Sequence, residues 1–106
     1  MTPIEVATLI GDVLTQIDAT LQTPGLDDAD WQTLYALRKH LDDMQRDLIG
    51  ESIDEADATY QALTTQLKDA NTELTAVIGD LAKVSKVIDI VSQIASYADK
   101  ILNKMA

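Results

Sequence analysis

The one histidine of this chain, His40, is the residue type most often used for acid–base and metal chemistry near neutral pH. In a helical bundle, a dimetal site uses a histidine placed three residues after a glutamate. Position 37 holds a leucine, so that pattern is absent here. We therefore expect His40 to be an ordinary, partly exposed helix residue and not a general base or a metal ligand.

The acidic run Asp27-Asp28-Ala29-Asp30 could begin a calcium-binding loop. Such a loop needs Gly at its sixth position and Glu at its twelfth, where this chain has Gln32 and Arg38. The sequence also has no Cys, no glycine-rich phosphate loop and no Gly-x-Ser-x-Gly turn for a nucleophile. We expect no catalytic residue, no metal and no cofactor, so the chain is not predicted to be an enzyme.

A group of carboxylates surrounds Gly50, with Arg46 as the only nearby base. We name it the acidic tip, and its members are Asp42, Asp43, Asp47, Glu51, Asp54, Glu55 and Asp57. Acids stabilise the start of a helix, but Asp43 and Asp47 lie near the expected end of one, where acids are mildly unfavourable. The acidic tip is either a docking site for a basic partner surface or a solvated, solubilising corner, and we favour the second interpretation.

Two aromatic residues, Trp31 and Tyr35, are spaced to lie one helical turn apart. Such residues are common at the centres of protein interfaces. They also close the ends of helical cores, and we favour that interpretation.

The composition of the chain favours long helices. Of its 106 residues, 46% are hydrophobic but only 4% are aromatic, and there are two Pro and four Gly. A core of Leu, Ile, Val and Ala suits packed helices, and few turn-forming residues imply few, long elements. We therefore predict an all-α fold in a single domain over residues 1–106.

Residues that start and stop helices divide the chain into three segments. Thr2-Pro3-Ile4-Glu5 forms a capping box at the start of the first, and Pro24-Gly25 ends it. Gly50 ends the second, and a further capping box, Ser52-Ile53-Asp54-Glu55, starts the third. The helices are predicted over about residues 3–22, 28–49 and 52–103.

Apolar residues of the third segment follow one another at alternating steps of three and four, which is a heptad seam. They are Ile53, Ala56, Tyr60, Leu63, Leu67, Ala70, Leu74, Val77, Leu81, Val84, Ile88, Val91, Ala95, Ala98 and Leu102. The seam passes Gly79 without losing its phase, so we favour one unbroken helix of about 78 Å. In the alternative, Gly79 ends one helix and Asp80 starts the next, which makes an up-and-down four-helix bundle.

The apolar stripe widens after Gly79. We name the widened part the C-terminal apolar face, and it consists of Val84, Val87, Ile90, Val91, Ile94, Tyr97 and Ile101. A wide stripe needs two or more helical neighbours, or another chain, to cover it. Either the segment folds back over the first two helices, or a second copy or partner covers it. We predict that this face is an assembly surface.

The formal net charge of −10 is unevenly distributed. Residues 1–80 carry sixteen acids and four bases, whereas residues 81–106 carry two acids and four bases. This balance disfavours nucleic acid and anionic lipid as partners. No segment has the length of a membrane span or the pattern of a secretory signal, so we expect a soluble, cytoplasmic protein without stable membrane insertion.

These features together predict binding to a protein and no reaction. We favour a non-catalytic helical interaction or assembly module, in a homo-oligomer or a hetero-complex, that acts through the C-terminal apolar face. The alternative is a small acidic inhibitor or immunity-type protein that masks a basic site on its partner.

Overall fold

The computed structural model describes residues 2–50 and 54–105. α-Helices make up most of this part of the chain, and it contains no strand. The helices are α1 (Pro3–Leu21), α2 (Asp28–Ile49), α3 (Ala58–Val77) and α4 (Val84–Met105), and a short 3-10 helix, η1 (Leu81–Lys83), precedes α4. The all-α prediction is confirmed.

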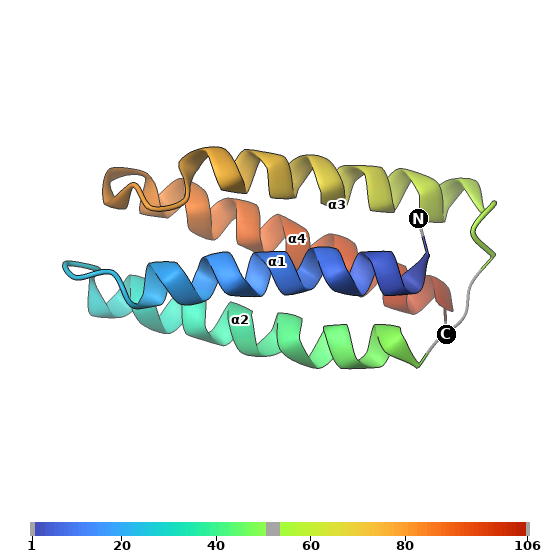
Figure 1. The fold of residues 1–106 in the computed structure, drawn as a ribbon, viewed down its shortest axis with the longest axis horizontal. Helices are drawn as coiled ribbons and strands as arrows, with labels where there is room; N and C mark the ends of the chain where they lie inside the picture. The colour runs from blue at the N-terminus through green and yellow to red at the C-terminus, as the bar shows by residue number, and fades with distance from the viewer. Residues whose placement is uncertain (1, 51–53, 106) are drawn as a thin grey trace.

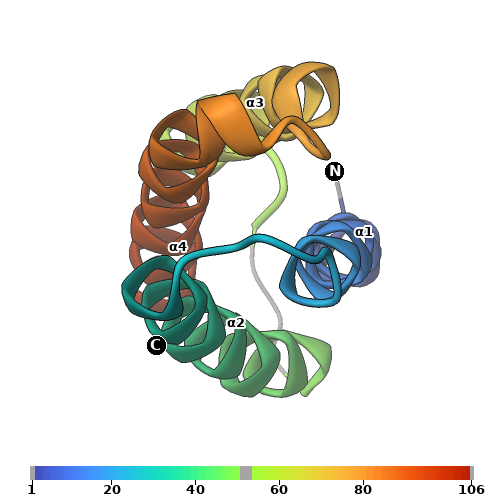
Figure 2. The same cartoon turned by 90° about the vertical axis from the view of Figure 1, so that its left-hand side faces the viewer.

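The helices form two antiparallel hairpins, α1–α2 and α3–α4, in a bundle that measures 44 × 22 × 17 Å (Figure 1). Seen along its length, the bundle has the order α1, α2, α4, α3 around its circumference (Figure 2). α2 packs closely against α1 and α4, and α4 packs closely against α2 and α3. α1 and α3 approach each other less closely, so they form the looser edge of the bundle.

The start of α1 is the one predicted from the sequence. Thr2 Oγ1 accepts a hydrogen bond from the amide of Glu5 at 3.0 Å, and Glu5 Oε1 accepts one from the amide of Thr2 at 3.3 Å. This is a reciprocal capping box, with Pro3 at the first helical position. The helix ends before the turn that contains Pro24 and Gly25, also as predicted.

The third helix starts later than predicted. Residues 52–53 of the predicted capping box lie outside the described part of the chain. Asp54 accepts a hydrogen bond from the amide two residues later at 3.0 Å, and Asp57 caps the helix by accepting one from the amide of Tyr60 at 2.9 Å. Because aspartates that bond nearby amides favour turns over helix, the helix begins at Ala58.

The prediction of one unbroken helix over residues 52–103 is wrong, and the four-helix alternative is confirmed. α3 ends at Val77, and Gly79 has a φ of +89°, a left-handed conformation that glycine adopts without steric cost. Asp80 then accepts a hydrogen bond from the amide of Ala82 at 3.0 Å and starts η1. The chain reverses here because α4 then buries its wide apolar stripe against helices of the same chain.

Polar side chains join α1 and α3 across the looser edge. Gln16 Nε2 donates a hydrogen bond to Asn71 Oδ1 at 3.0 Å, and Thr75 Oγ1 donates one to Gln16 Oε1 at 3.1 Å. The sequence pattern does not single out these three residues, because a polar side chain at helical spacing looks the same whether it faces water or another helix.

Candidate protein-binding surfaces

The C-terminal apolar face lies in the core of the bundle. Two of its members, Val84 and Tyr97, are partly buried against the core, and the others are at most 3% exposed. α4 packs between α2 and α3, which explains why its apolar stripe is wider than that of α3. Of the two coverings that the sequence left open, the structure has the one in which the chain's own helices cover this face, and its role in assembly stays a prediction. The most buried members are Val87, Ile90, Val91, Ile94 and Ile101.

Three members of the acidic tip support the fold itself. Asp42 forms an ion pair with Arg46, one turn later on α2, at 2.6 Å. Asp54 and Asp57 bond the backbone amides that lead into α3. Asp57 Oδ2 also lies 3.3 Å from Lys104 Nζ, near the end of α4. These contacts explain part of the acidic tip without a partner.

The other described members of the acidic tip are exposed. Asp43 and Asp47 lie one turn apart on α2, and Glu55 lies in the turn before α3. Glu51 lies outside the described residues. Among the described members, Asp43, Asp47 and Glu55 are therefore carboxylates that lie open to solvent.

The excess negative charge belongs to the first hairpin and to the segment that follows it. Residues 2–50, which contain α1 and α2, carry nine acids and three bases. Residues 58–105, which contain α3 and α4, carry five acids and five bases. A basic protein surface would therefore be attracted to the α1–α2 hairpin more than to the α3–α4 hairpin.

The large hydrophobic side chains that stay exposed lie on the same hairpin. Scattered exposed hydrophobic residues are normal on a protein surface, and their distribution carries more information than their number. In the described part of the chain, all of them belong to α1 or α2. They are Ile4, Trp31, Tyr35 and Ile49, with exposed fractions of 69%, 39%, 50% and 63%.

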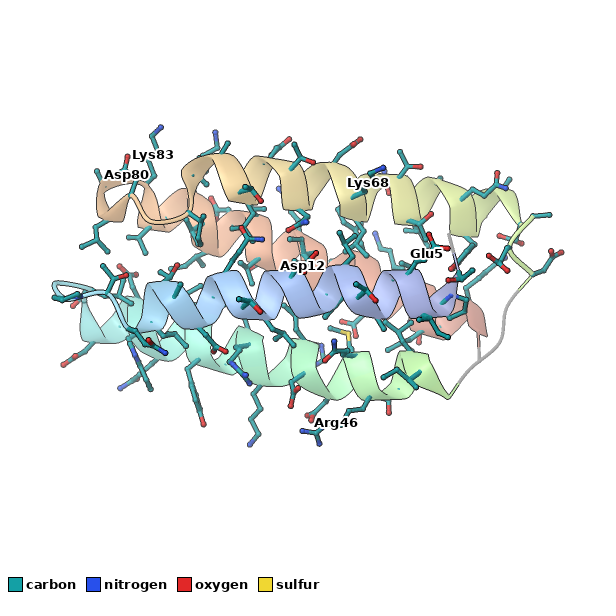
Figure 3. The ribbon with its side chains drawn as sticks, viewed as in Figure 1. Glu5, Asp12, Arg46, Lys68, Asp80 and Lys83 are labelled. Atoms are coloured by element: carbon teal, nitrogen blue, oxygen red, sulfur yellow. The ribbon has the colours of Figure 1, made fainter. Side chains whose placement is uncertain are left out.

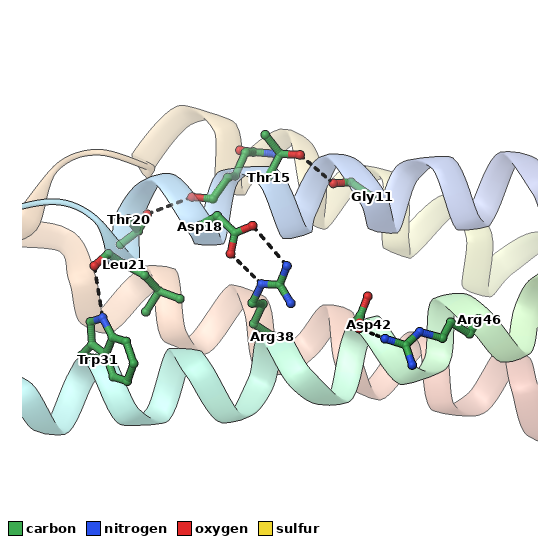
Figure 4. Close-up of polar contacts among 10 residues, drawn as sticks. Gly11, Thr15, Asp18, Thr20, Leu21, Trp31, Arg38, Asp42 and Arg46 are labelled. Carbon is green, nitrogen blue, oxygen red and sulfur yellow. Dashed lines mark hydrogen bonds and ion pairs between the residues drawn. The ribbon is translucent and has the colours of Figure 1, made fainter.

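Trp31 and Tyr35 form a stacked pair at the surface. Their ring centroids are 5.1 Å apart and their planes differ by 7°. Trp31 Nε1 donates a hydrogen bond to the carbonyl of Leu21, at the end of α1, at 3.1 Å (Figure 4). This bond holds the indole in place while both rings remain accessible. The interpretation of the pair as the closed end of the core is therefore wrong.

The stacked pair begins a row of side chains along one face of α2. The row follows steps of three and four residues, so it lies along one side of the helix. Near its middle, Arg38 donates two hydrogen bonds to the Asp18 carboxylate of α1, at 2.6 and 3.2 Å (Figure 4). Arg46 projects away from the bundle (Figure 3). We name this row the α2 outer face; it consists of Trp31, Tyr35, Arg38, Asp42, Arg46 and Ile49.

His40 lies in an open, shallow groove between α2 and α4. Its Nε2 is 3.2 Å from Asp99 Oδ2, and its side chain is exposed, as the sequence predicts for its exposure. Within residues 2–50 and 54–105, no three His, Asp or Glu side chains are grouped to hold a metal ion. The groove has a volume of about 710 Å³ and is lined by Ala29, Gln32, Thr33, Ala36, Leu37, His40 and Ser92.

Comparison of this chain with protein-family models, with curated proteins and with solved structures finds no match. In the described part of the chain, no helix combines the length and the apolar content that crossing a bilayer requires.

Proposed function

We propose that this chain is a non-catalytic protein-binding module that docks its acidic α1–α2 hairpin on a basic surface of a partner protein, with the exposed apolar side chains of the α2 outer face in the contact. One observation carries the proposal: the exposed large hydrophobic side chains and the excess negative charge occur on the same hairpin. This is the inhibitor-type alternative from the sequence, with the binding surface moved from the acidic tip alone to the α2 outer face. The expected cytoplasmic location stays a prediction.

The two kinds of residue would contribute differently to binding. Trp31, Tyr35 and Ile49 offer apolar area, and aromatic residues are typical of the positions that carry most of the affinity at an interface. The exposed carboxylates of Asp43 and Asp47 would attract a basic partner and speed its association. The bonds from Trp31 to Leu21 and from Arg38 to Asp18 hold this surface in one conformation, which lowers the entropic cost of binding.

The favoured prediction from the sequence, assembly through the C-terminal apolar face, now requires the bundle to open. Five members of that face are fully or almost fully buried in the folded chain. Separating α4 from its neighbours would expose these side chains, and each loses about 1.5–3 kcal/mol of burial free energy when it is exposed. The α2 outer face needs no such rearrangement.

The test compares capture of the partner from a lysate of the source cells by three forms of the chain. The wild type and a control with Thr65→Ala and Thr72→Ala on the exposed side of α3 should retain the same basic protein. The double variant Trp31→Ala/Tyr35→Ala should lose it. Retention should also weaken when ionic strength rises from about 0.1 M to about 1 M, which shortens the Debye length from about 10 Å to about 3 Å. Equal retention by all three forms would contradict the proposal.

A further inference from the structure

The turn between α3 and α4 interrupts a segment that is otherwise suited to a single helix. The apolar seam keeps its phase through Val77, Leu81 and Val84. The two prolines of the chain are Pro3 and Pro24, so none lies in this segment. If residues 58–105 were joined without the turn, they would form a helix about 72 Å long at 1.5 Å per residue.

Gly79 is the residue that makes the reversal possible. Its φ is +89°, a conformation that residues with a side chain rarely adopt. A Cβ atom added there would meet no other atom within 4 Å, so the space around Gly79 does not restrict its replacement. Asp80 and Lys83 point to the outside of the bundle (Figure 3), whereas Ile78 of the same turn is partly buried against the core. Gly79 therefore permits the reversal through its backbone conformation, while the packing of α4 favours it.

The other hairpin turn differs in a way that provides a control. Gly25 has nearly the same conformation, with a φ of +91°. It follows Pro24, which lacks a backbone N–H and cannot continue a helix. An added Cβ at Gly25 would lie 3.4 Å from Leu81 Cδ1, an ordinary contact. Replacement by a residue with a side chain would thus cause the same backbone strain at both positions, but only Gly79 lies where the two flanking helices can join.

We propose that this chain forms a domain-swapped dimer in which α3 and α4 of each copy join into one helix. Straightening the turn withdraws α4 from its own bundle and would expose the buried side chains of Val91 and Ile94. The α4 helix of a second copy has the same side chains and fills the vacated position, so the contacts of α4 with α2 and α3 are made again between copies.

The exchange also creates one new contact, where the two joined helices cross near their midpoints. Leu81 and Val84 are only partly buried in the single chain. In the dimer, these residues of both copies meet and are covered further, which favours the dimer at high concentration. The α2 outer face is unchanged, so this inference is independent of the proposed function.

The first test replaces the glycine that permits the turn. Gly79→Ala adds strain to the reversed chain and favours the continuous helix in each copy, so the dimer dissociation constant should fall by roughly two to three orders of magnitude. Gly25→Ala should lower the Tm but leave the dimer dissociation constant at its wild-type value, because Pro24 prevents joining of α1 and α2. Two glycines inserted after Asp80 in the Gly79→Ala chain should restore the monomer. Light scattering measures the mass, and a monomeric Gly79→Ala chain would overturn the proposal.

The second test distinguishes exchange of α4 from ordinary dimerisation. Asp57 and Lys104 lie 3.3 Å apart, so a carbodiimide can join their side chains as an amide. Heavy-isotope-labelled and unlabelled chains are mixed, unfolded and refolded together at high concentration before cross-linking. A swapped dimer gives cross-linked peptides with one labelled and one unlabelled half. If every cross-linked peptide has both halves labelled or both halves unlabelled, the proposal is overturned. The experiment uses the wild-type chain, so it can be done even if the Gly79→Ala chain does not fold.

Discussion

At the scale of single residues, Asp57 connects the start of α3 to the end of α4. One carboxylate oxygen accepts the hydrogen bond from the amide of Tyr60 at 2.9 Å, and the other lies 3.3 Å from Lys104 Nζ. The Tyr60 amide first, and the Lys104 ammonium after it, lower the pKa of Asp57 from its ordinary value. The ionised form of Asp57 is therefore more stable in the folded chain than in the unfolded chain.

The lowered pKa of Asp57 predicts a contribution to acid unfolding. The stability that this carboxylate contributes is fully present above its pKa in the unfolded chain, which is about 4. It is lost as the pH falls through the lower pKa of the same group in the folded chain. Asp57→Asn keeps an oxygen that can cap the helix but does not titrate. Urea unfolding followed by circular dichroism should therefore show a smaller loss of stability below about pH 4 in this variant. Identical acid dependence in both chains would contradict this role.

A matched pair of isoleucines tests the burial of α4. Ile94 is 0% exposed and Ile49 is 63% exposed. Ile94→Ala should lower the free energy of unfolding by about 2–5 kcal/mol. Ile49→Ala should change it by less than about 0.5 kcal/mol. Denaturant unfolding measures both, and losses of equal size would mean that α4 is not packed as described.

At the scale of helices, the first residue of a helix can be predicted from the sequence where only one nearby residue can cap it. Thr2 and Glu5 satisfy each other within four positions, so the start of α1 follows from the sequence alone. Several residues before α3 could cap the helix, and only the structure shows that Asp57 is the one that does so. Whether Gly79 lies in a helix or a turn depends on which neighbours α4 finds, and that is not encoded in the residues around Gly79.

The arrangement of the helices predicts different protection from hydrogen exchange. α4 has close neighbours on two sides, whereas α1 contacts α3 weakly through the Gln16–Asn71 hydrogen bond. Amides in the middle of α4 should therefore exchange more slowly than those in the middle of α1. Gln16→Ala should speed exchange in α1, while the exposed-site control Gln66→Ala should not. Mass spectrometry measures this, and equal protection of α1 and α4 would contradict the packing order.

At the scale of the whole molecule, the two hairpins have different surfaces. The α3–α4 hairpin is balanced in charge, and among the described residues it exposes no large hydrophobic side chain. The α1–α2 hairpin is acidic and exposes several. The charge asymmetry was predictable from residue counts. The α2 outer face was not, because Trp31 and Tyr35 have the spacing of core residues, and only the packing of α1 against α2 decides that they remain outside.

The solution mass of the wild-type chain at low concentration tests most directly whether the C-terminal apolar face belongs to the chain's own core. The account predicts a monomer of 11.6 kDa by light scattering, because α2 and α3 of the same chain already cover α4. A fixed multiple of that mass, unchanged on dilution, would contradict the account, since it would mean that another chain is needed to cover this face.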